Sequence, residues 1–315
     1  MQAGLRAGPA SATHRPSICG GLPRPYRWVA LRVWRIARNV YLVDHVFAGL
    51  PGIVGTYVVV GDGGEAAVID PGPRSSYPVI ERFLEERGLR PRAVLLTHIH
   101  LDHAAAAELV AERFGARVYV HPRGAKHLVD PSRLCEAARS IMRDVDMVGC
   151  PQGLRDELIH STSDGEVVDI GGRRFKFIYT PGHASHHQSI LLEDEEVLFV
   201  GDSMGIFYCE CIVPLTPPPT RPAMIRESVG KMLGLKPRLL AYPHFGVHPD
   251  PEAAAREMLA RLDEWPRFER FEELLERDVC ARRVYECRRE APYFGGEVER
   301  SWRGLRDAAI PGGSG

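Results

Sequence analysis

The chain has 315 residues, enough to bury a sizeable core in one large domain or two smaller ones. Its 40 basic and 41 acidic residues nearly cancel, which argues against a general nucleic-acid or membrane-surface binder. The sequence has no run of about 18 apolar residues, and its start lacks the apolar segment of a signal peptide. We therefore expect a cytoplasmic protein without a membrane span, preceded by a disordered tail over residues 1–27.

The first half of the folded region predicts strands where apolar residues alternate and helices where they recur every three or four positions. The predicted strands are residues 30–46, 53–60, 66–70, 93–97 and 117–121. The predicted helices are residues 78–87 and 103–114. The first strands follow one another through short turns, so this sheet should begin with antiparallel pairs.

Residues 122–164 are less regular, with one predicted helix over residues 131–146. A segment of this length beside strand ends is a candidate lid or substrate wall. A simple connector helix explains the pattern equally well, and both interpretations remain open.

The second half repeats the strand-strand-strand-helix order of the first. Its predicted strands are residues 166–170, 174–180, 188–192, 197–200 and 239–242. Its predicted helices are residues 221–233 and 251–290, the latter broken at Trp265-Pro266. Two sheets with helices outside predict an α/β (α+β) fold, a four-layer αββα sandwich of two mixed sheets with a C-terminal helical extension.

The seven cysteines are scattered through a long chain and do not have the spacing of a secreted disulfide framework. Only Cys209 and Cys211 are close together. We interpret this pair as core packing rather than as a metal site.

The main chemical motif is His98-Ile99-His100-Leu101-Asp102-His103, with three imidazoles and one carboxylate in six positions. It lies between a predicted buried strand and an Ala-rich helix, where side chains can converge outside a sheet. In an extended segment, His98 and His100 point to the same side. Imidazole nitrogen and carboxylate oxygen suit Zn, Fe, Ni or Mn. With 13 histidines in 315 residues, chance clustering is a poor explanation.

Three later strand ends present further metal-binding side chains. Each has an apolar strand, then Gly or Pro, then the side chain: His183, Asp202 and His244. A single such residue is usually a cap or turn former. Together with the histidine cluster, the three form a coherent set of metal ligands.

This set resembles that of the metallo-β-lactamase fold superfamily over residues 29–249, and all seven ligand positions match. The resemblance implies a catalytic domain over residues 28–249 and a C-terminal helical extension over residues 250–315. It implies two divalent metal ions, with zinc favoured and iron or manganese as alternatives. The implied first-ion ligands are His98, His100 and His183, the second-ion ligands are Asp102, His103 and His244, and Asp202 is the bridge.

The implied chemistry is hydrolysis by a hydroxide bound to the two metals, which cleaves an ester, thioester, lactone or phosphoester. The predicted catalytic residues are Asp202, which bridges the ions, and Asp102, which shuttles a proton. The substrate is expected to be a small molecule. Candidates to orient the ligands or touch substrate are Asp70, Thr97, Ser185, His186, His187 and Ser203.

Within the superfamily, the long interval before His183 and the helical C-terminus resemble the glyoxalase II and lactonase branch. Quorum-quenching lactonases carry a Tyr where this chain has Gly205, which argues against lactone cleavage. The alternative is an oxidoreductase similar to the persulfide dioxygenases, which use a single iron. Flavodiiron proteins carry Glu at the position of His100, which argues against that branch. The C-terminal helices are expected either to close over the site or to form a homodimer interface.

Overall fold

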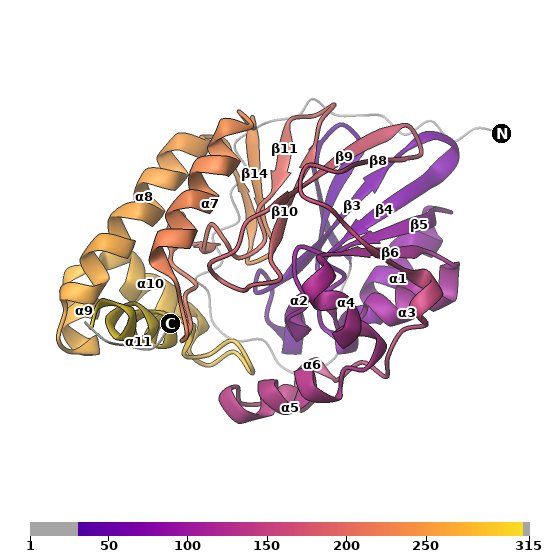
Figure 1. Ribbon diagram of the computed structural model, residues 1–315. Coiled ribbons are helices and arrows are strands. Elements are labelled where there is room, and N and C mark those ends of the chain that lie inside the picture. The colour runs from indigo at the N-terminus through magenta and orange to yellow at the C-terminus, as the bar shows by residue number, and fades with distance from the viewer. Residues whose placement is uncertain (1–30, 311–315) are drawn as a thin grey trace.

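The computed structural model describes residues 31–310, so the predicted tail over residues 1–27 lies outside the described part of the chain. Two mixed sheets pack against each other, and helices cover the outer face of each (Figure 1). The predicted four-layer α/β sandwich with C-terminal helices is therefore confirmed. None of the helices between residues 31 and 310 is long and apolar enough to cross a membrane.

The first sheet holds seven strands in sequence order. They are β1 (Arg32–Ala37), β2 (Val40–Asp44), β3 (Gly55–Val60), β4 (Glu65–Ile69), β5 (Arg90–Leu95), β6 (Arg117–Val120) and β7 (Ile159–Ser161). The strands β1 to β4 pair antiparallel, and β4 to β7 pair parallel. The predicted strand over residues 30–46 is two strands, because the chain turns at Asn39, where φ is 56°.

The second sheet has the order β15-β14-β11-β10-β9-β8. Its strands are β8 (Val167–Ile170), β9 (Arg173–Tyr179), β10 (Gln188–Leu192), β11 (Val197–Phe199), β14 (Leu239–Tyr242) and β15 (Gly246–His248). Only β11 and β14 pair parallel, and helix α7 (Pro222–Gly234) lies between them in the chain. A separate hairpin, β12 (Ile206–Tyr208) and β13 (Cys211–Val213), was not predicted from the sequence.

Apolar side chains fill the space between the sheets and the space beneath each helical layer. The layer between the sheets includes Leu42, Tyr57, Ile69, Phe177 and Phe199, all of which are buried. On the outside of the first sheet, helix α1 (Tyr77–Glu86) buries Ile80, Phe83 and Leu84, as its amphipathic pattern predicts. The helix predicted over residues 103–114 is divided into α2 (Leu101–Ala104) and α3 (Ala107–Phe114).

The segment after β6 forms three helices. They are α4 (Pro122–Val129), α5 (Ser132–Ile141) and α6 (Val145–Val148). The single helix predicted over residues 131–146 ends early, at Ile141, and α6 is separate from it because Asp144 adopts a left-handed conformation with φ of 56°. Buried residues of α5 and α6 belong to one apolar cluster with Phe47, Leu101 and Phe294. Short 3₁₀ turns complete the described elements: η1 (Phe47–Gly49), η2 (Asp62–Gly64), η3 (Arg74–Ser76), η4 (Asp156–Leu158) and η5 (Trp265–Arg267).

Four C-terminal helices pack beyond the second sheet (Figure 1). They are α8 (Pro251–Glu264), α9 (Phe271–Arg277), α10 (Val279–Arg288) and α11 (Glu297–Ala309). The break at Trp265-Pro266 is confirmed, and α11 is an addition to the helical region predicted to end near residue 290. The domain boundary between residues 249 and 250 remains a prediction.

Two disulfides correct the interpretation of the cysteines. Cys135 pairs with Cys150 across the α5–α6 segment, and Cys211 pairs with Cys280 to join β13 to α10. Cys211 is buried in the core, so it is both a packing residue and a covalent link. Its partner lies 69 residues away, which is why the spacing of the cysteines does not reveal it. The predicted cytoplasmic location therefore receives no support from the cysteines.

Candidate metal centre

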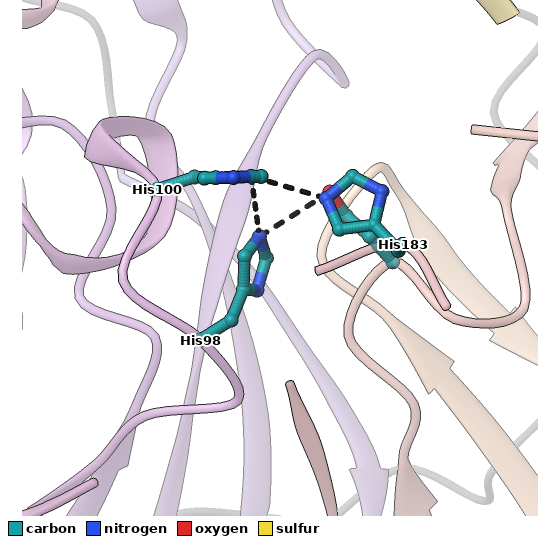
Figure 2. A group of neighbouring side chains, drawn as sticks. His98, His100 and His183 are labelled. Carbon is teal, nitrogen blue, oxygen red and sulfur yellow. Dashed lines mark hydrogen bonds and ion pairs between the residues drawn. The ribbon is translucent and has the colours of Figure 1, made fainter. Parts of the chain in front are cut away.

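Three histidines from two loops point their imidazoles toward one point (Figure 2). His98 Nε2 and His183 Nε2 each lie 3.0 Å from His100 Nδ1. His98 and His100 follow β5, and His183 follows β9 on the second sheet. Nitrogen atoms that converge in this way suit a shared cation better than a mutual hydrogen-bond network.

Asp202 lies between this group and a second one. Its Oδ2 is 3.3 Å from His183 Nε2 and 3.5 Å from His98 Nε2. Its Oδ1 is 3.3 Å from His103 Nε2 and 3.7 Å from His244 Nε2. The side chain is buried, yet Oδ1 has no hydrogen-bond partner among the described residues. A buried carboxylate oxygen without a donor fits a metal ligand.

The second group contains Asp102, His103 and His244, all of them buried. Asp102 Oδ2 lies 3.1 Å from His244 Nε2, and His244 Nε2 lies 3.2 Å from His103 Nε2. The ligand atoms of this group lie within 4.8 Å of one another, as do those of the group formed by His98, His100, His183 and Asp202. The structure thus brings together all seven predicted ligands, and their donor set fits two divalent ions.

Carbonyl groups orient two of the histidines. His183 Nδ1 lies 2.8 Å from the carbonyl oxygen of Leu215, and His244 Nδ1 lies 3.3 Å from that of Ile53. Because a carbonyl only accepts, each Nδ1 carries the proton and each Nε2 directs its lone pair into the cluster. This is the tautomer that a metal ligand needs.

Asp70 orients one histidine in each group. Its Oδ2 lies 3.1 Å from His103 Nδ1 and accepts from the Thr97 hydroxyl at 2.6 Å. The Thr97 hydroxyl in turn lies 3.1 Å from His98 Nδ1. Since the Thr97 proton is directed to Asp70, the Thr97 oxygen accepts from His98. Asp70 and Thr97, both predicted as supporting residues, are therefore buried partners of the ligands.

His187 holds the loop that carries Asp202. The backbone N–H of Asp202 donates to His187 Nε2 at 3.0 Å, and His187 Nδ1 lies 2.9 Å from the hydroxyls of Thr180 and Ser203. Gly201 precedes Asp202 with φ of +54°, and a Cβ there would lie 2.3 Å from His187 Nε2. Glycine is therefore required for this close approach.

The remaining two predicted candidates lie farther out. His186 is partly buried, and the centroid of its ring is 5.4 Å from that of His100. Burial, together with the charge of His183, lowers the pKa of His186 to about 4. Ser185 is exposed. His186 therefore borders the site as a neutral side chain, whereas Ser185 lies on the exposed surface.

The local backbone at the motif differs from the prediction. Strand β5 ends at Leu95, so His98 and His100 do not lie in an extended strand. His100 instead occupies the position before α2, with φ of −59° and ψ of 149°. The rings converge as predicted, but they do so from the loop between the strand and the helix.

Burial and neighbouring charges set the protonation of the cluster. Burial lowers the pKa of His98 and of His100 well below 6.5. Burial disfavours charge on His103 too, but the carboxylates of Asp202 and Asp102 raise its pKa well above 6.5. Against the effect of burial, His103 and other imidazoles hold the pKa of Asp102 and of Asp202 below 3.8. Metal binding at the second group should therefore displace a proton from His103.

One residue near the ligands was not predicted. The Tyr293 hydroxyl, from the segment between α10 and α11, lies 3.3 Å from Asp102 Oδ1. Burial and the Asp102 charge raise the pKa of Tyr293 well above 10, so the hydroxyl is a donor. Tyr293 lies 191 residues from Asp102, and no sequence motif marks it.

Gly205 has no room for a side chain, because a Cβ there would lie 2.2 Å from the Val213 carbonyl oxygen.

Comparisons with known proteins agree with this fold and cluster. The chain is 33% identical over 159 residues to the metallo-beta-lactamase fold-containing protein ST1585 of Sulfurisphaera tokodaii, covering 49% of this chain and 60% of that protein. The crystal structure of ST1585 matches with a TM-score of 0.69 at 27% identity, covering 86% of this chain and 99% of that one. A hydroxyacylglutathione hydrolase of Acidiphilium cryptum is 29% identical over 206 residues, which cover 62% of this chain and 70% of that protein.

The first relatives are matched over less than two thirds of their length, between 60% and 64%. A family model described as the metallo-beta-lactamase superfamily matches residues 50–244, which is more than half of the chain. That segment contains all seven residues of the candidate metal centre. The chain therefore belongs to the metallo-beta-lactamase superfamily.

Proposed function

We propose that the protein is a hydrolase that uses two divalent metal ions, with zinc favoured, to cleave an ester, thioester, lactone or phosphoester in a small molecule. The observation that carries this proposal is the geometry of Asp202. Its Oδ2 faces the histidines of the first group, and its Oδ1 faces those of the second. A carboxylate placed in this way can bridge two ions.

Divalent ions bound here would polarise a substrate oxygen and lower the pKa of water toward neutrality. The protein supplies the fixed ligands for this chemistry. Asp70 and the Ile53 and Leu215 carbonyls fix the imidazoles, so that little reorganisation is needed on binding. Asp102, an ionised carboxylate in the second group, is the residue placed to accept a proton and pass it to the leaving group.

His186 is the side chain that we propose for substrate contact. It borders the first group, with its ring centroid 5.4 Å from that of His100, and it is neutral because its pKa is lowered to about 4. A neutral imidazole can donate or accept one hydrogen bond without attracting an anion. Buried residues of helices α5 and α6 share an apolar cluster with Leu101, which lies between His100 and Asp102 in the ligand motif, and this supports the substrate-wall interpretation of the segment.

The names of two relatives support a thioester as one of the substrates to test. Two of them, from Haemophilus influenzae and Acidiphilium cryptum, are named hydroxyacylglutathione hydrolases. Their identities to this chain are 31% and 29% over part of each protein. The family and the metal centre thus support hydrolysis, and the relatives make an acyl-glutathione the first compound to try.

Two complete ligand groups favour this hydrolase over the single-iron oxidoreductase that the sequence leaves as an alternative. The second group has its own oriented imidazoles, His103 on Asp70 and His244 on the Ile53 carbonyl. Such orientation is expected of ligands that hold an ion. A site with one iron would leave this second group unused.

The test measures metal content first and hydrolysis second. Protein purified without added metal is analysed by elemental mass spectrometry, then assayed with S-lactoylglutathione, an aryl ester, a lactone and a phosphodiester. The variants His100→Ala and Asp202→Ala are compared with His127→Ala, a matched histidine change on α4. We expect about two zinc ions per chain and a loss of at least about 100-fold in kcat/KM for the two ligand variants only.

One iron per chain with oxygen consumption would overturn the hydrolase proposal in favour of the oxidoreductase. Full activity in Asp202→Ala would also contradict it, because the proposed bridge would then be dispensable. Inactivity of the wild type toward all four compounds, with two zinc ions present, would exclude the substrate classes named here.

A further inference from the structure

The segment between α10 and α11 reaches from the C-terminal helices to the second ligand group. Tyr293 in this segment is 6% exposed, and its hydroxyl lies 3.3 Å from Asp102 Oδ1. Phe294 is fully buried, with its ring centroid 5.5 Å from that of His244. Two consecutive side chains of the extension therefore touch two residues of the candidate metal centre.

The two oxygens of the Asp102 carboxylate face different partners. Oδ2 faces the ligand nitrogens, at 3.1 Å from His244 Nε2 and 3.5 Å from His103 Nε2. Oδ1 faces the Tyr293 hydroxyl. A hydrogen bond on the oxygen turned away from an ion fixes the rotation of the carboxylate and so fixes the oxygen that faces the ion.

A buried ion pair joins the two ends of the segment that carries Tyr293. Arg288 Nε lies 2.9 Å from Glu297 Oε2, and the two side chains are 2% and 6% exposed. Arg288 Nη1 also donates to the Ile53 carbonyl oxygen at 3.0 Å, the same oxygen that orients His244. The segment is thus anchored to the backbone that supports the second ligand group.

The backbone conformation of Tyr293 is strained. Its φ is +65°, in the left-handed region that residues other than glycine adopt with strain. The surrounding contacts hold the chain there: Phe294 packs against Phe47 with ring centroids 5.2 Å apart, and the Arg288–Glu297 pair lies on either side. Strain of this kind persists where the neighbouring structure determines the conformation.

We propose that Tyr293 is a positioning residue for the second metal ion, which it serves by holding Asp102 in the orientation that binds that ion. The inference rests on the proposed two-ion function and deepens it. The segment over residues 288–297 thereby becomes part of the metal centre, although it lies outside the matched family region of residues 50–244. Loss of such a partner costs about 10–100-fold in metal affinity in comparable sites.

The test is a zinc titration of the full-length protein in competition with a chromophoric chelator, without any substrate. The variant is Tyr293→Phe, which removes only the hydroxyl. The matched control is Tyr285→Phe, another tyrosine of the extension, whose ring packs on Phe271. We expect Tyr293→Phe to weaken the second zinc ion by about 10–100-fold and to leave the first unchanged.

A purely structural role for Tyr293 would lower thermal stability and affect both ions alike, so the selective loss of one ion is the informative result. A Tyr293→Phe protein that binds both ions as tightly as the wild type would overturn this inference alone. A wild type that binds only one ion would overturn the two-ion function as well. The two failures are therefore distinguishable in the same titration.

Discussion

Asp70 accepts a hydrogen bond from the Thr97 hydroxyl at 2.6 Å, and this single contact links the two halves of the metal centre. The oxygen that accepts it also faces His103 Nδ1, while the Thr97 oxygen faces His98 Nδ1. One carboxylate therefore sets the orientation of a ligand in each group. Its charge also favours protonated Nδ1 atoms, which leaves Nε2 to the metal.

Replacing Asp70 with Asn should weaken both metal ions. The amide offers one acceptor oxygen instead of two. Either the Thr97 backbone N–H, which donates to Oδ1 at 2.8 Å, or the donors that share Oδ2, His103 Nδ1 and the Thr97 hydroxyl, then face an NH₂ group. We expect a loss of about 10–100-fold in affinity for each ion, measured by zinc titration against a chelator. Asp263→Asn, which alters an exposed ion pair with Arg226, is the control. Unchanged affinity for both ions in Asp70→Asn would refute the role of Asp70.

Thr97→Val should act on one ion only. Valine has nearly the same shape but removes the hydroxyl between Asp70 and His98, and it leaves the direct contact of Asp70 with His103 in place. The first ion should weaken and the second should not. The same titration checks this, and equal losses at both ions would show that Thr97 supports the fold rather than one ligand.

Gly201→Ala should lower the free energy of unfolding by about 2–4 kcal/mol, because it combines strain at positive φ with overpacking. The new Cβ would lie 2.3 Å from His187 Nε2 and 2.8 Å from Thr97 Cβ. Gly88→Ala is the matched control, since Gly88 has φ of +60° and no atom within 4 Å of a built Cβ. The control should lose only about 1 kcal/mol in the same denaturant titration. Equal losses would mean that close packing at Gly201 adds nothing.

The free energy of unfolding should fall at acid pH, because the buried His45 resists protonation in the folded protein. Burial, with the charges of His244 and His103, lowers the pKa of His45 to about 3 from 6.5. The unfolded chain therefore binds more protons below pH 6.5, so the contribution of His45 is complete above that pH and is lost as the pH falls. Between pH 6.5 and 4.5 this amounts to about 2 kcal/mol.

His45→Gln should flatten this dependence. A glutamine amide can replace the His45 Nε2 contact with the Thr56 hydroxyl, which is 2.7 Å long, but it does not titrate. Denaturant unfolding of both proteins at pH 4.5 and 6.5 measures the difference in slope. Parallel curves for the two proteins would exclude His45 as the source.

The Cys211–Cys280 disulfide should stabilise the C-terminal helices against unfolding. It closes a loop with a sequence separation of 69, against 15 for Cys135–Cys150. Loop-closure entropy predicts a loss of about 4 kcal/mol for the paired change Cys211→Ser with Cys280→Ser, and about 3 kcal/mol for the shorter loop. Guanidinium unfolding of the two double variants compares them directly. A smaller loss for the Cys211 pair would contradict the loop-length account.

The convergence of the candidate ligands was predictable because each of these residues has a local signature. Four of them lie in one six-residue motif that runs from His98 to His103. His183, Asp202 and His244 each follow an apolar strand and a Gly or Pro. The two sheets were predictable for the same reason, since alternating apolar residues are a local pattern. Short elements such as the β12–β13 hairpin have too few residues for a period to show.

The missed features depend on contacts between distant parts of the chain. The carbonyl oxygens of Ile53 and Leu215 orient candidate ligands. Because every residue has a backbone carbonyl, the residue type does not show which of them accepts such a hydrogen bond. Tyr293 reaches Asp102 across 191 residues. A sequence shows which residues could bind a metal, whereas their outer partners emerge only when the sheets and helices are packed.

Each ligand group takes side chains from both halves of the sandwich, which ties metal binding to assembly. His98, His100, Asp102 and His103 follow a strand of the first sheet, whereas His183, Asp202 and His244 follow strands of the second. A fragment that contains one half alone carries an incomplete set for either ion. Zinc should therefore bind during folding only once the two sheets have packed together, so the rate of zinc uptake should report the rate of that step.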